Sequence, residues 1–427
     1  MAPIPPVRLP PHGRRRHKTG HVSSRKTPIL PSSDTSTRDD GPGGWLIFAF
    51  ALACGVTVAN VYYAQPLVGP ISLSFGISVA TGSLIVTMLQ LGYVAGLLFF
   101  APLGDLIENK RLILLTMSAL IACLLISTAA PNAPVFIASS LLLGISAVGT
   151  QMIIPMAAHL TPERRRGQVV GTVVSGALFG ILLARPLSTL IAGSFGWRAV
   201  YWMSAAAMCA ILALMAVALP RRQPRHALTY PKLIHSLWDL LITTPLLRRR
   251  AAMQAPFFGA FSLFWTASPL LLEAPPFSLG HLALSAFLLS GVAGAMVAPL
   301  AGRLADSGHS RALTGAAIVA MGLSFVLTWI GGTGSLTAFV LAGILLDAGS
   351  QTHLIVGQRA IFTLAPEVRS RLNALYMGLF FFGGAVGSAV SGTAVSHGGA
   401  TYVSWIGLGF TAIAMVLFAA EAMGKKK

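Results

Sequence analysis

Apolar runs of about 20 residues recur along this chain from Trp45 almost to its end. An α-helix needs a run of that length to cross the ~30 Å hydrocarbon core of a bilayer. A membrane β-barrel would show short segments of alternating polarity instead, so helices are the expected spanning structure. Twelve spans are predicted, at residues 45–67, 79–101, 112–130, 134–158, 168–193, 199–219, 252–273, 282–302, 312–331, 335–357, 373–394 and 401–421.

The composition fits a membrane protein and excludes a soluble one. Hydrophobic residues make up 55% of the chain and charged residues 10%, whereas about a quarter of the residues in a soluble domain are charged. A soluble fold of this composition would lack polar surface to face water. The three cysteines, Cys54, Cys123 and Cys209, lie inside apolar runs without paired or metal-ligand spacing. They are expected to be small buried hydrophobes.

The basic residues predict an orientation. The chain has 30 Lys+Arg against 12 Asp+Glu, a net charge of +18. The basic residues cluster between apolar runs, which indicates membrane topology and not nucleic-acid binding. With the N-terminus placed inside, only Arg185 and Arg198 lie away from the cytoplasmic side or its membrane edge. The positive-inside rule therefore predicts that both termini are cytoplasmic.

Composition also divides the chain into segments. The first residues are rich in Pro, Ser, Arg and His without an apolar run, which is typical of a disordered tail and not of a signal peptide. The predicted organisation is a disordered basic tail at 1–44, a six-helix bundle at 45–220, a cytoplasmic linker at 221–250, a second six-helix bundle at 251–421 and a basic tail at 422–427.

Short motifs recur in the two groups of six spans. The matching pairs share their order and membrane side and are separated by ~200 residues, which indicates a parallel repeat of six helices. The pairs are Pro102–Arg111 with Pro299–Arg311, Val148–Gln151 with Ala348–Gln351, and Thr161–Arg166 with Ala365–Arg371.

With these motifs, residues 45–421 resemble the major facilitator superfamily, whose loop signature between spans two and three is G-x-L-A-D-R-x-G-R-R. The segments Asn60–Leu67, Gly196–Trp202 and Leu346–Gln351 resemble a bacterial branch near the twelve-span drug:proton antiporters. The resemblance implies an all-α membrane protein of two pseudo-symmetric six-helix bundles, a secondary transporter of the bacterial inner membrane. The second-half signature matches at Gly302, Leu304, Ala305, Asp306 and Arg311, with Ser307 for the first Arg; the first-half copy keeps Leu103, Asp105 and Lys110, with Ala101 and Glu108 for the glycines.

The resemblance implies a cytoplasmic gate at the two loop signatures. Asp105 and Asp306 lie at helix ends beside basic residues, where a carboxylate can accept backbone N–H groups and pair with a neighbouring Arg. Capping without a role in switching is the alternative. The residues of the expected gate are Asp105, Lys110, Arg111, Asp306 and Arg311.

Asp347 is the acidic residue best placed inside a span. It lies about 12 residues, or ~18 Å, into the tenth run and hence near mid-bilayer. A charge at that depth costs ~3 kcal/mol, so Asp347 should face a cavity or a partner. Burial favours the neutral carboxyl form, which makes Asp347 the candidate proton carrier. A structural residue bonded to a neighbouring helix is the alternative.

Arg185 is the basic counterpart in the fifth span, where Arg185-Pro186 replaces the Gly-Pro pair of the antiporter signature. It could bind an anionic substrate, neutralise a buried carboxylate, or extend to the outer interface as a long side chain. The sequence leaves open whether Arg185 meets Asp347.

The family arrangement places spans 1, 4, 7 and 10 around a central cavity. It therefore implies Tyr63, Gln151, Trp265 and Gln351 as lining candidates. Interfacial aromatic residues and hydrogen bonds between helices are the alternative explanation.

The predicted function is proton-coupled export of small organic molecules by alternating access. Proton-coupled uptake of a small, perhaps anionic, solute bound by Arg185 is an alternative, as is a non-transporting receptor or scaffold. No Walker, HExxH or Gly-x-Ser-x-Gly motif is present, so ATP hydrolysis and intramembrane enzyme chemistry are not expected. The expected energy source is the proton gradient, with no cofactor, metal or nucleic acid. The expected partners are a small-molecule substrate and the lipid bilayer, and the expected state is a monomer.

Overall fold

The computed structural model describes residues 42–221, 223, 229–364 and 368–424. Over these ranges the chain is helical and has no strand, as the sequence predicts. Most of the two predicted tails, 1–44 and 422–427, lies outside the described residues.

The first six predicted spans are helical, and polar caps begin several of them. Ser78 accepts the N–H of Thr81 at 3.1 Å, and Asn132 accepts that of Val135 at 3.1 Å, so each satisfies a free donor of a helix N-terminus. The elements are α1 Gly44–Ala59, η1 Gln65–Leu67, α2 Val68–Phe75, α3 Val79–Ala95, the π-helical turn η2 Gly96–Phe100, η3 Ala101–Asp105, α4 Asn109–Ala129, α5 Ala133–Ser146, η4 Ala147–Gly149, α6 Thr150–Leu160, α7 Glu163–Phe195 and α8 Trp197–Ala218.

The second six spans are helical as well. The elements are α9 Tyr230–Thr243, α10 Pro245–Glu273, α11 His281–Leu288, η5 Leu289–Gly291, α12 Val292–Asp306, α13 Ser310–Gly331, α14 Leu336–Phe362 and α15 Arg369–Gly424. Helix α15 contains the last two spans, which meet in a kink at Gly399 where φ is 56°. Only glycine adopts that conformation without strain.

The number of predicted spans agrees with the helices. In the described part of the chain, nine helices are long and apolar enough to cross a bilayer, and one of these is α15 with its two spans. Two shorter apolar helices, Gly44–Ala59 and His281–Gly291, begin the remaining two.

Four runs that read as continuous spans are broken inside, and one of them, 79–101, passes from α3 into the π-helical turn η2 after Ala95. The first, 45–67, leaves the α-helix after Ala59. Asn60 turns its amide back to the carbonyl of Val56 at 2.8 Å, and its Oδ1 accepts the Ser204 hydroxyl at 2.5 Å. Proline at position 66 then removes a backbone donor. Short 3₁₀ turns, η4 and η5, break runs 134–158 and 282–302.

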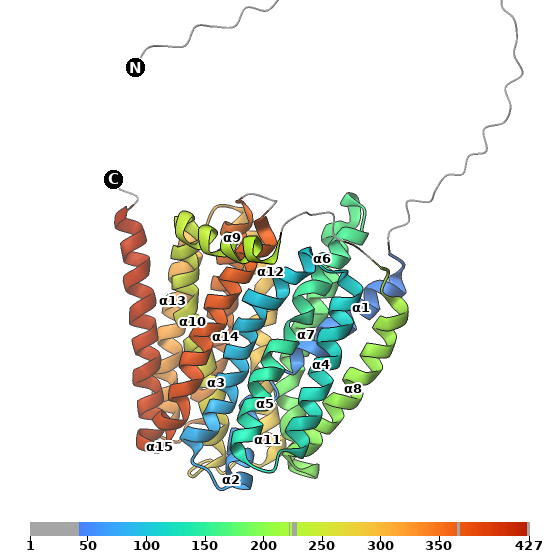
Figure 1. Cartoon of the computed structure of the whole chain (residues 1–427). Coiled ribbons are helices and arrows are strands. Elements are labelled where there is room, and N and C mark those ends of the chain that lie inside the picture. Colours follow the sequence, from blue (N-terminus) through green and yellow to red (C-terminus); the bar gives the residue numbers. More distant parts are fainter. Residues whose placement is uncertain (1–41, 222, 224–228, 365–367, 425–427) are drawn as a thin grey trace, which may run out of the picture. The chain divides into compact units, whose positions relative to one another are not determined.

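Part of the segment predicted as a linker, 221–250, is also helical. It contains α9, and α10 begins inside it at Pro245. Leu233 and Leu237 of α9 are buried, four residues apart on one helix face. In Figure 1, α9 lies across one end of the bundle and α2 lies at the opposite end. We call these ends the α9 side and the α2 side; the predicted topology makes the α9 side cytoplasmic.

Glycine contacts repeat between the halves. In the first half, a Cβ atom at Gly180 of α7 would lie 2.1 Å from the Gly55 carbonyl oxygen of α1. In the second half, a Cβ at Gly387 of α15 would lie 1.9 Å from the Gly259 carbonyl oxygen of α10. Each pair needs glycine because the backbones touch. The same two spans of each half meet in the same way, as expected for the parallel repeat.

Candidate functional site

Helix α14 carries Asp347 into the interior of the bundle. The helix begins at the cap residue Ser335, and Asp347 lies about 17 Å along it, close to its midpoint. The side chain is buried, with 4% of its surface exposed. Trp265, which is buried on α10, donates its indole N–H to Asp347 Oδ1 at 3.0 Å. The carboxyl group therefore has a partner on a neighbouring helix.

Arg185 is buried in α7 and does not extend to an interface, since only 3% of its surface is exposed. Its Nε donates to Gln65 Oε1 at 2.7 Å, so η1 holds one side of the guanidinium. Three aromatic rings surround the same group. Its central carbon lies 4.6 Å from the ring centre of Trp265, 5.0 Å from that of Phe261 and 5.3 Å from that of Tyr62. Cation–π attraction stabilises a guanidinium in such surroundings.

Gly291 marks the point on which the two charged residues converge. A Cβ atom there would lie 2.6 Å from Asp347 Oδ2 and 3.6 Å from Arg185 Nη1, with Trp265 Cζ2 at 3.5 Å. Asp347 and Arg185 are not among the ion pairs in the described part of the chain, and each contacts Trp265 instead. We call Asp347, Trp265, Arg185, Gln65 and Gly291 the central cluster.

Two of the four lining candidates belong with this cluster. Trp265 is part of it. Gln351 lies one turn beyond Asp347, and a Cβ at Gly294 of α12 would lie 3.0 Å from Asp347 Cβ and 3.0 Å from Gln351 Cγ. Tyr63 is buried in the turn after α1, next to Tyr62.

Gln151 belongs to a different set of contacts, which connects the two halves. Its Nε2 donates to the Tyr93 hydroxyl at 3.2 Å, and Asn373 of α15 donates to its Oε1 at 3.4 Å. Gln358 of α14 in turn donates to Asn373 at 3.4 Å. The structure thus separates Gln151 from the other lining candidates.

A second buried polar group in the second half was not identified as a site from the sequence. Gln254 Oε1 is hydrogen-bonded to His353 Nδ1 and accepts the Tyr376 hydroxyl at 3.1 Å. The His353 ring stacks on Phe257 at 4.2 Å between ring centres. The sequence could have indicated this group, because His353 lies in an apolar run six residues after Asp347 and a polar residue there requires a partner.

The predicted gate residues do not form a single cluster of contacting side chains in the described structure. Asp306 pairs with Arg359 at the end of α14, and not with Arg311. Arg311 lies on α13 with its guanidinium 5.9 Å from the Phe418 ring centre. The difference arises because α12 ends at Asp306 while Arg311 already belongs to the next helix. In the first half, Asp105 ends η3, Lys110 lies in the first turn of α4, and Arg111 pairs with Glu108 at 3.3 Å.

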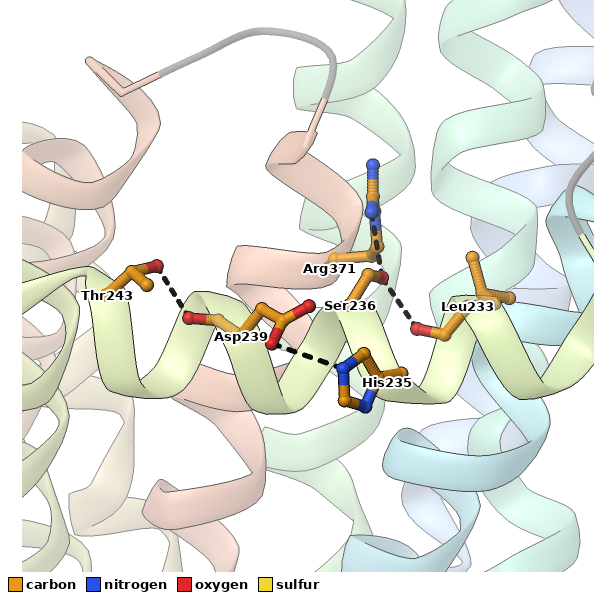
Figure 2. Close-up of polar contacts among 6 residues, drawn as sticks. All are labelled: Leu233, His235, Ser236, Asp239, Thr243 and Arg371. Atoms are coloured by element: carbon orange, nitrogen blue, oxygen red, sulfur yellow. Dashed lines mark hydrogen bonds and ion pairs between the residues drawn. The ribbon is translucent and has the colours of Figure 1, made fainter.

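Helix α9 bonds to both halves on its side of the bundle. Figure 2 shows Arg371, from the start of α15, donating to the Ser236 hydroxyl, at 2.8 Å. At the first residue of α9, the Tyr230 hydroxyl donates to the Phe99 carbonyl of η2 at 3.0 Å. His235 and Asp239 pair at 3.5 Å on the exposed face. Helix α9 is therefore docked on both bundles.

Metal-binding geometry is not found in the residues that the structure describes, where no three His, Cys, Asp or Glu side chains group around a possible ion. Among the described residues, the buried polar groups include the carboxylate of Asp347, the guanidinium of Arg185, amides, hydroxyls and the imidazole of His353. Such groups can bind a solute and exchange protons.

Comparison with known proteins agrees with this architecture. The family model described as Major Facilitator Superfamily matches residues 46–350. The chain is 38% identical over 358 residues to the "Uncharacterized transporter YgaY" of Escherichia coli O157:H7, covering 83% of this chain and 90% of the relative. It is 24% identical over 390 residues to a "Probable sugar efflux transporter" of Helicobacter pylori strain G27, covering 87% of this chain and 94% of the relative. A crystal structure of the nucleoside transporter NupG superposes with a TM-score of 0.68 at 14% identity, covering 88% of this chain and 98% of that one.

Proposed function

Because the chain belongs to the major facilitator superfamily, and is thus a multi-pass membrane transporter and not an enzyme, we propose that it moves a small organic molecule by proton-coupled alternating access. The observation that carries the proposal is the buried carboxyl group of Asp347, bonded to Trp265 and facing Arg185 across Gly291. A carboxylate at mid-span is costly unless it has partners or takes up a proton. We assign Asp347 as the proton site and the central cluster as the substrate site.

Contacts between the halves support rocking as the mechanism. On the α9 side, Asn373 reaches Gln151, as described above. In the interior, Gln90 of α3 donates to Ser262 of α10 at 2.9 Å. Near the α2 side, Gly69 of α2 lies close to α10, since a Cβ atom there would lie 3.1 Å from Leu270 Cδ2. Opening toward one side requires the contacts of that side to break while the others persist.

Two directions of transport have support. Export, the direction predicted from the sequence, is favoured by the resemblance to drug:proton antiporters and by the relative named as a sugar efflux transporter. Uptake together with a proton is favoured by the buried guanidinium of Arg185, which suits an anionic solute. The proposal includes a monomer in the bacterial inner membrane with both termini in the cytoplasm.

Proteoliposomes containing the full chain test the proposal. After a substrate screen in a strain that lacks other exporters, the compound found is assayed with and without an imposed pH gradient. We expect the gradient to drive transport by the wild type, and Asp347→Asn to abolish that drive while exchange of labelled for unlabelled substrate continues. The matched control is Asp239→Asn, on the exposed face of α9. Gradient-driven transport by Asp347→Asn at the wild-type rate would reject the proton site.

A further inference from the structure

The central cluster contains buried hydrogen-bond donors without a partner in the described part of the chain, and these indicate what the site binds. We infer that the acidic group of a small organic anion binds to Arg185 and Gln65, and that Asp347 takes up a proton when the anion binds. The inference rests on the proposed proton-coupled transport and adds to it a substrate class and the sign of the coupling.

Arg185 and Gln65 each carry a buried donor that the described structure leaves without an acceptor. Arg185 Nε donates to Gln65 Oε1, which fixes the two side chains together. Yet Arg185 Nη2 and Gln65 Nε2 are buried and have no hydrogen-bond partner among the described residues. The two side chains are 3% and 1% exposed, so bulk water does not satisfy these groups. Both are donors, and the missing partner must therefore be an acceptor.

A third unpaired group lies close by. Ser290 precedes Gly291, and its buried Oγ also lacks a partner in the described structure. A Cβ at Gly343 would lie 3.0 Å from that Oγ and 3.4 Å from Trp265 Cη2, which places the hydroxyl beside the indole. A guanidinium, an amide and a hydroxyl with free hydrogen-bonding capacity are a typical receptor for a carboxylate or a phosphate group.

The aromatic surroundings distinguish an organic anion from an inorganic one and from a cation. Tyr62, Phe261 and Trp265 present their rings to the guanidinium of Arg185 and provide apolar contact area for the body of an organic ligand. An organic cation would use the same rings, but Arg185 already occupies them with a like charge. The cluster therefore selects against a cation.

The coupling follows from the charges. With the site empty, the charges of Arg185 and an ionised Asp347 compensate each other across Gly291. An anion on Arg185 adds a negative charge near Asp347, and repulsion in this low-dielectric interior is relieved when Asp347 is protonated. By linkage, the proton must then strengthen anion binding to the same extent. Anion and proton therefore bind together and move in the same direction, which is the uptake candidate.

The surroundings of Asp347 contain few other groups that could titrate. Arg185 from α7 and the Tyr62 hydroxyl from the turn after α1 face the site. Helix α10 contributes Trp265, and η5 and α12 contribute Gly291 and Gly294. The charged residues and histidine of α13 and α15 lie near the helix ends or near the kink at Gly399, and α14 itself carries His353 nearly two turns away.

Binding to the purified full chain tests this inference with four probes of one shape. These are phenylacetate, phenyl phosphate, phenethylamine and 2-phenylethanol, assayed by thermal shift and by titration between pH 5 and 8. We expect one or both anions to raise the melting temperature and the other two probes not to do so. A response to phenyl phosphate alone or phenylacetate alone identifies the acidic group. Arg185→Gln should weaken anion binding at least tenfold, and Gln65→Leu severalfold.

The pH dependence of anion affinity distinguishes binding that is coupled to protonation of Asp347 from simple attraction of the anion to Arg185. Wild-type affinity for phenylacetate, which remains an anion over this range, should rise at least tenfold from pH 8 to pH 5, and in Asp347→Asn it should be high and nearly independent of pH. For phenyl phosphate, whose own second ionisation lies at about pH 6, the wild type is compared with Asp347→Asn at each pH. Arg198→Gln is the matched control, because Arg198 also lies over a tryptophan ring, that of Trp197 at 4.2 Å, but near the end of its helix. Stabilisation by phenethylamine, no binding of either anion, or undiminished binding to Arg185→Gln overturns the inference. Gradient-driven transport of a neutral or cationic compound would reject the anion site and leave the proposed transporter function standing.

Discussion

Replacing Gly291 by alanine would place one methyl group where Asp347, Trp265 and Arg185 converge. The new Cβ would lie 2.6 Å from Asp347 Oδ2, against an ordinary C···O separation of about 3.3–3.6 Å. The carboxylate would have to retreat by roughly 1 Å, which is enough to lengthen its 3.0 Å hydrogen bond with Trp265 beyond useful range. Loss of a hydrogen bond to a charged group costs about 1.5–3 kcal/mol, and overpacking adds about 1–3 kcal/mol.

The expected result is a loss of both stability and coupling in Gly291→Ala. A cost of about 1.4 kcal/mol is a factor of ten in an equilibrium, so proton-driven transport should fall at least tenfold, with a lower melting temperature. Gly315→Ala on α13 is the control, because a Cβ there meets only Phe418 at an ordinary 3.8 Å. Proteoliposome flux and thermal unfolding check both variants. Wild-type flux in Gly291→Ala, with or without a lower melting temperature, would refute the conclusion that transport depends on the close approach of Asp347 and Arg185 at Gly291.

Three other substitutions examine the central cluster and the ion pair between Asp306 and Arg359. Trp265→Phe keeps a ring over Arg185 but removes the donor to Asp347. A cost of about 1.5–3 kcal/mol for that bond predicts that proton-driven flux falls at least tenfold; unchanged flux would show that the bond is not needed. Asp306→Asn and Arg359→Gln each break an exposed pair and should change the free energy of unfolding by less than about 1 kcal/mol. If this ion pair is part of the cytoplasmic gate, Asp306→Asn and Arg359→Gln should slow transport equally, and the double variant should be no slower than either. Additive effects of the two substitutions would argue against a shared role in the gate.

The positions of the spans were predictable because bilayer thickness sets the length of each apolar run. The internal breaks were not, because they depend on contacts distant in sequence. Asn60, for example, leaves the helix where it meets Ser204, 144 residues away. The kink at Gly399 likewise replaces what reads as a loop between two runs. Run length therefore predicts how many helices cross, and tertiary contacts decide where they bend.

In the candidate site, too, some features could be predicted from the sequence and others depend on tertiary contacts. Burial of Asp347 followed from its place in an apolar run, whereas the sequence left open whether Arg185 is buried or extends to the outer interface. Their convergence on Gly291 depends on the rotation of α7, α14 and η5 about their axes. Gln151 was grouped with Gln351 because the family arrangement places spans 4 and 10 at the central cavity, yet it bonds to Tyr93 and Asn373. The halves are similar in backbone, and different side chains at equivalent positions give them different interiors.

The docking of α9 has a consequence for how the halves separate. Only Thr244 lies between α9 and α10, so α9 has no slack with respect to the second half. Its bond to Arg371 is also with that half. In the proposed rocking movement we therefore expect α9 to move with the second half, while the hydrogen bond of Tyr230 joins it to the first half. If the halves rock as proposed, opening on the α9 side would detach this tyrosine from the Phe99 carbonyl, and the boundary between the two bodies would lie at the beginning of α9.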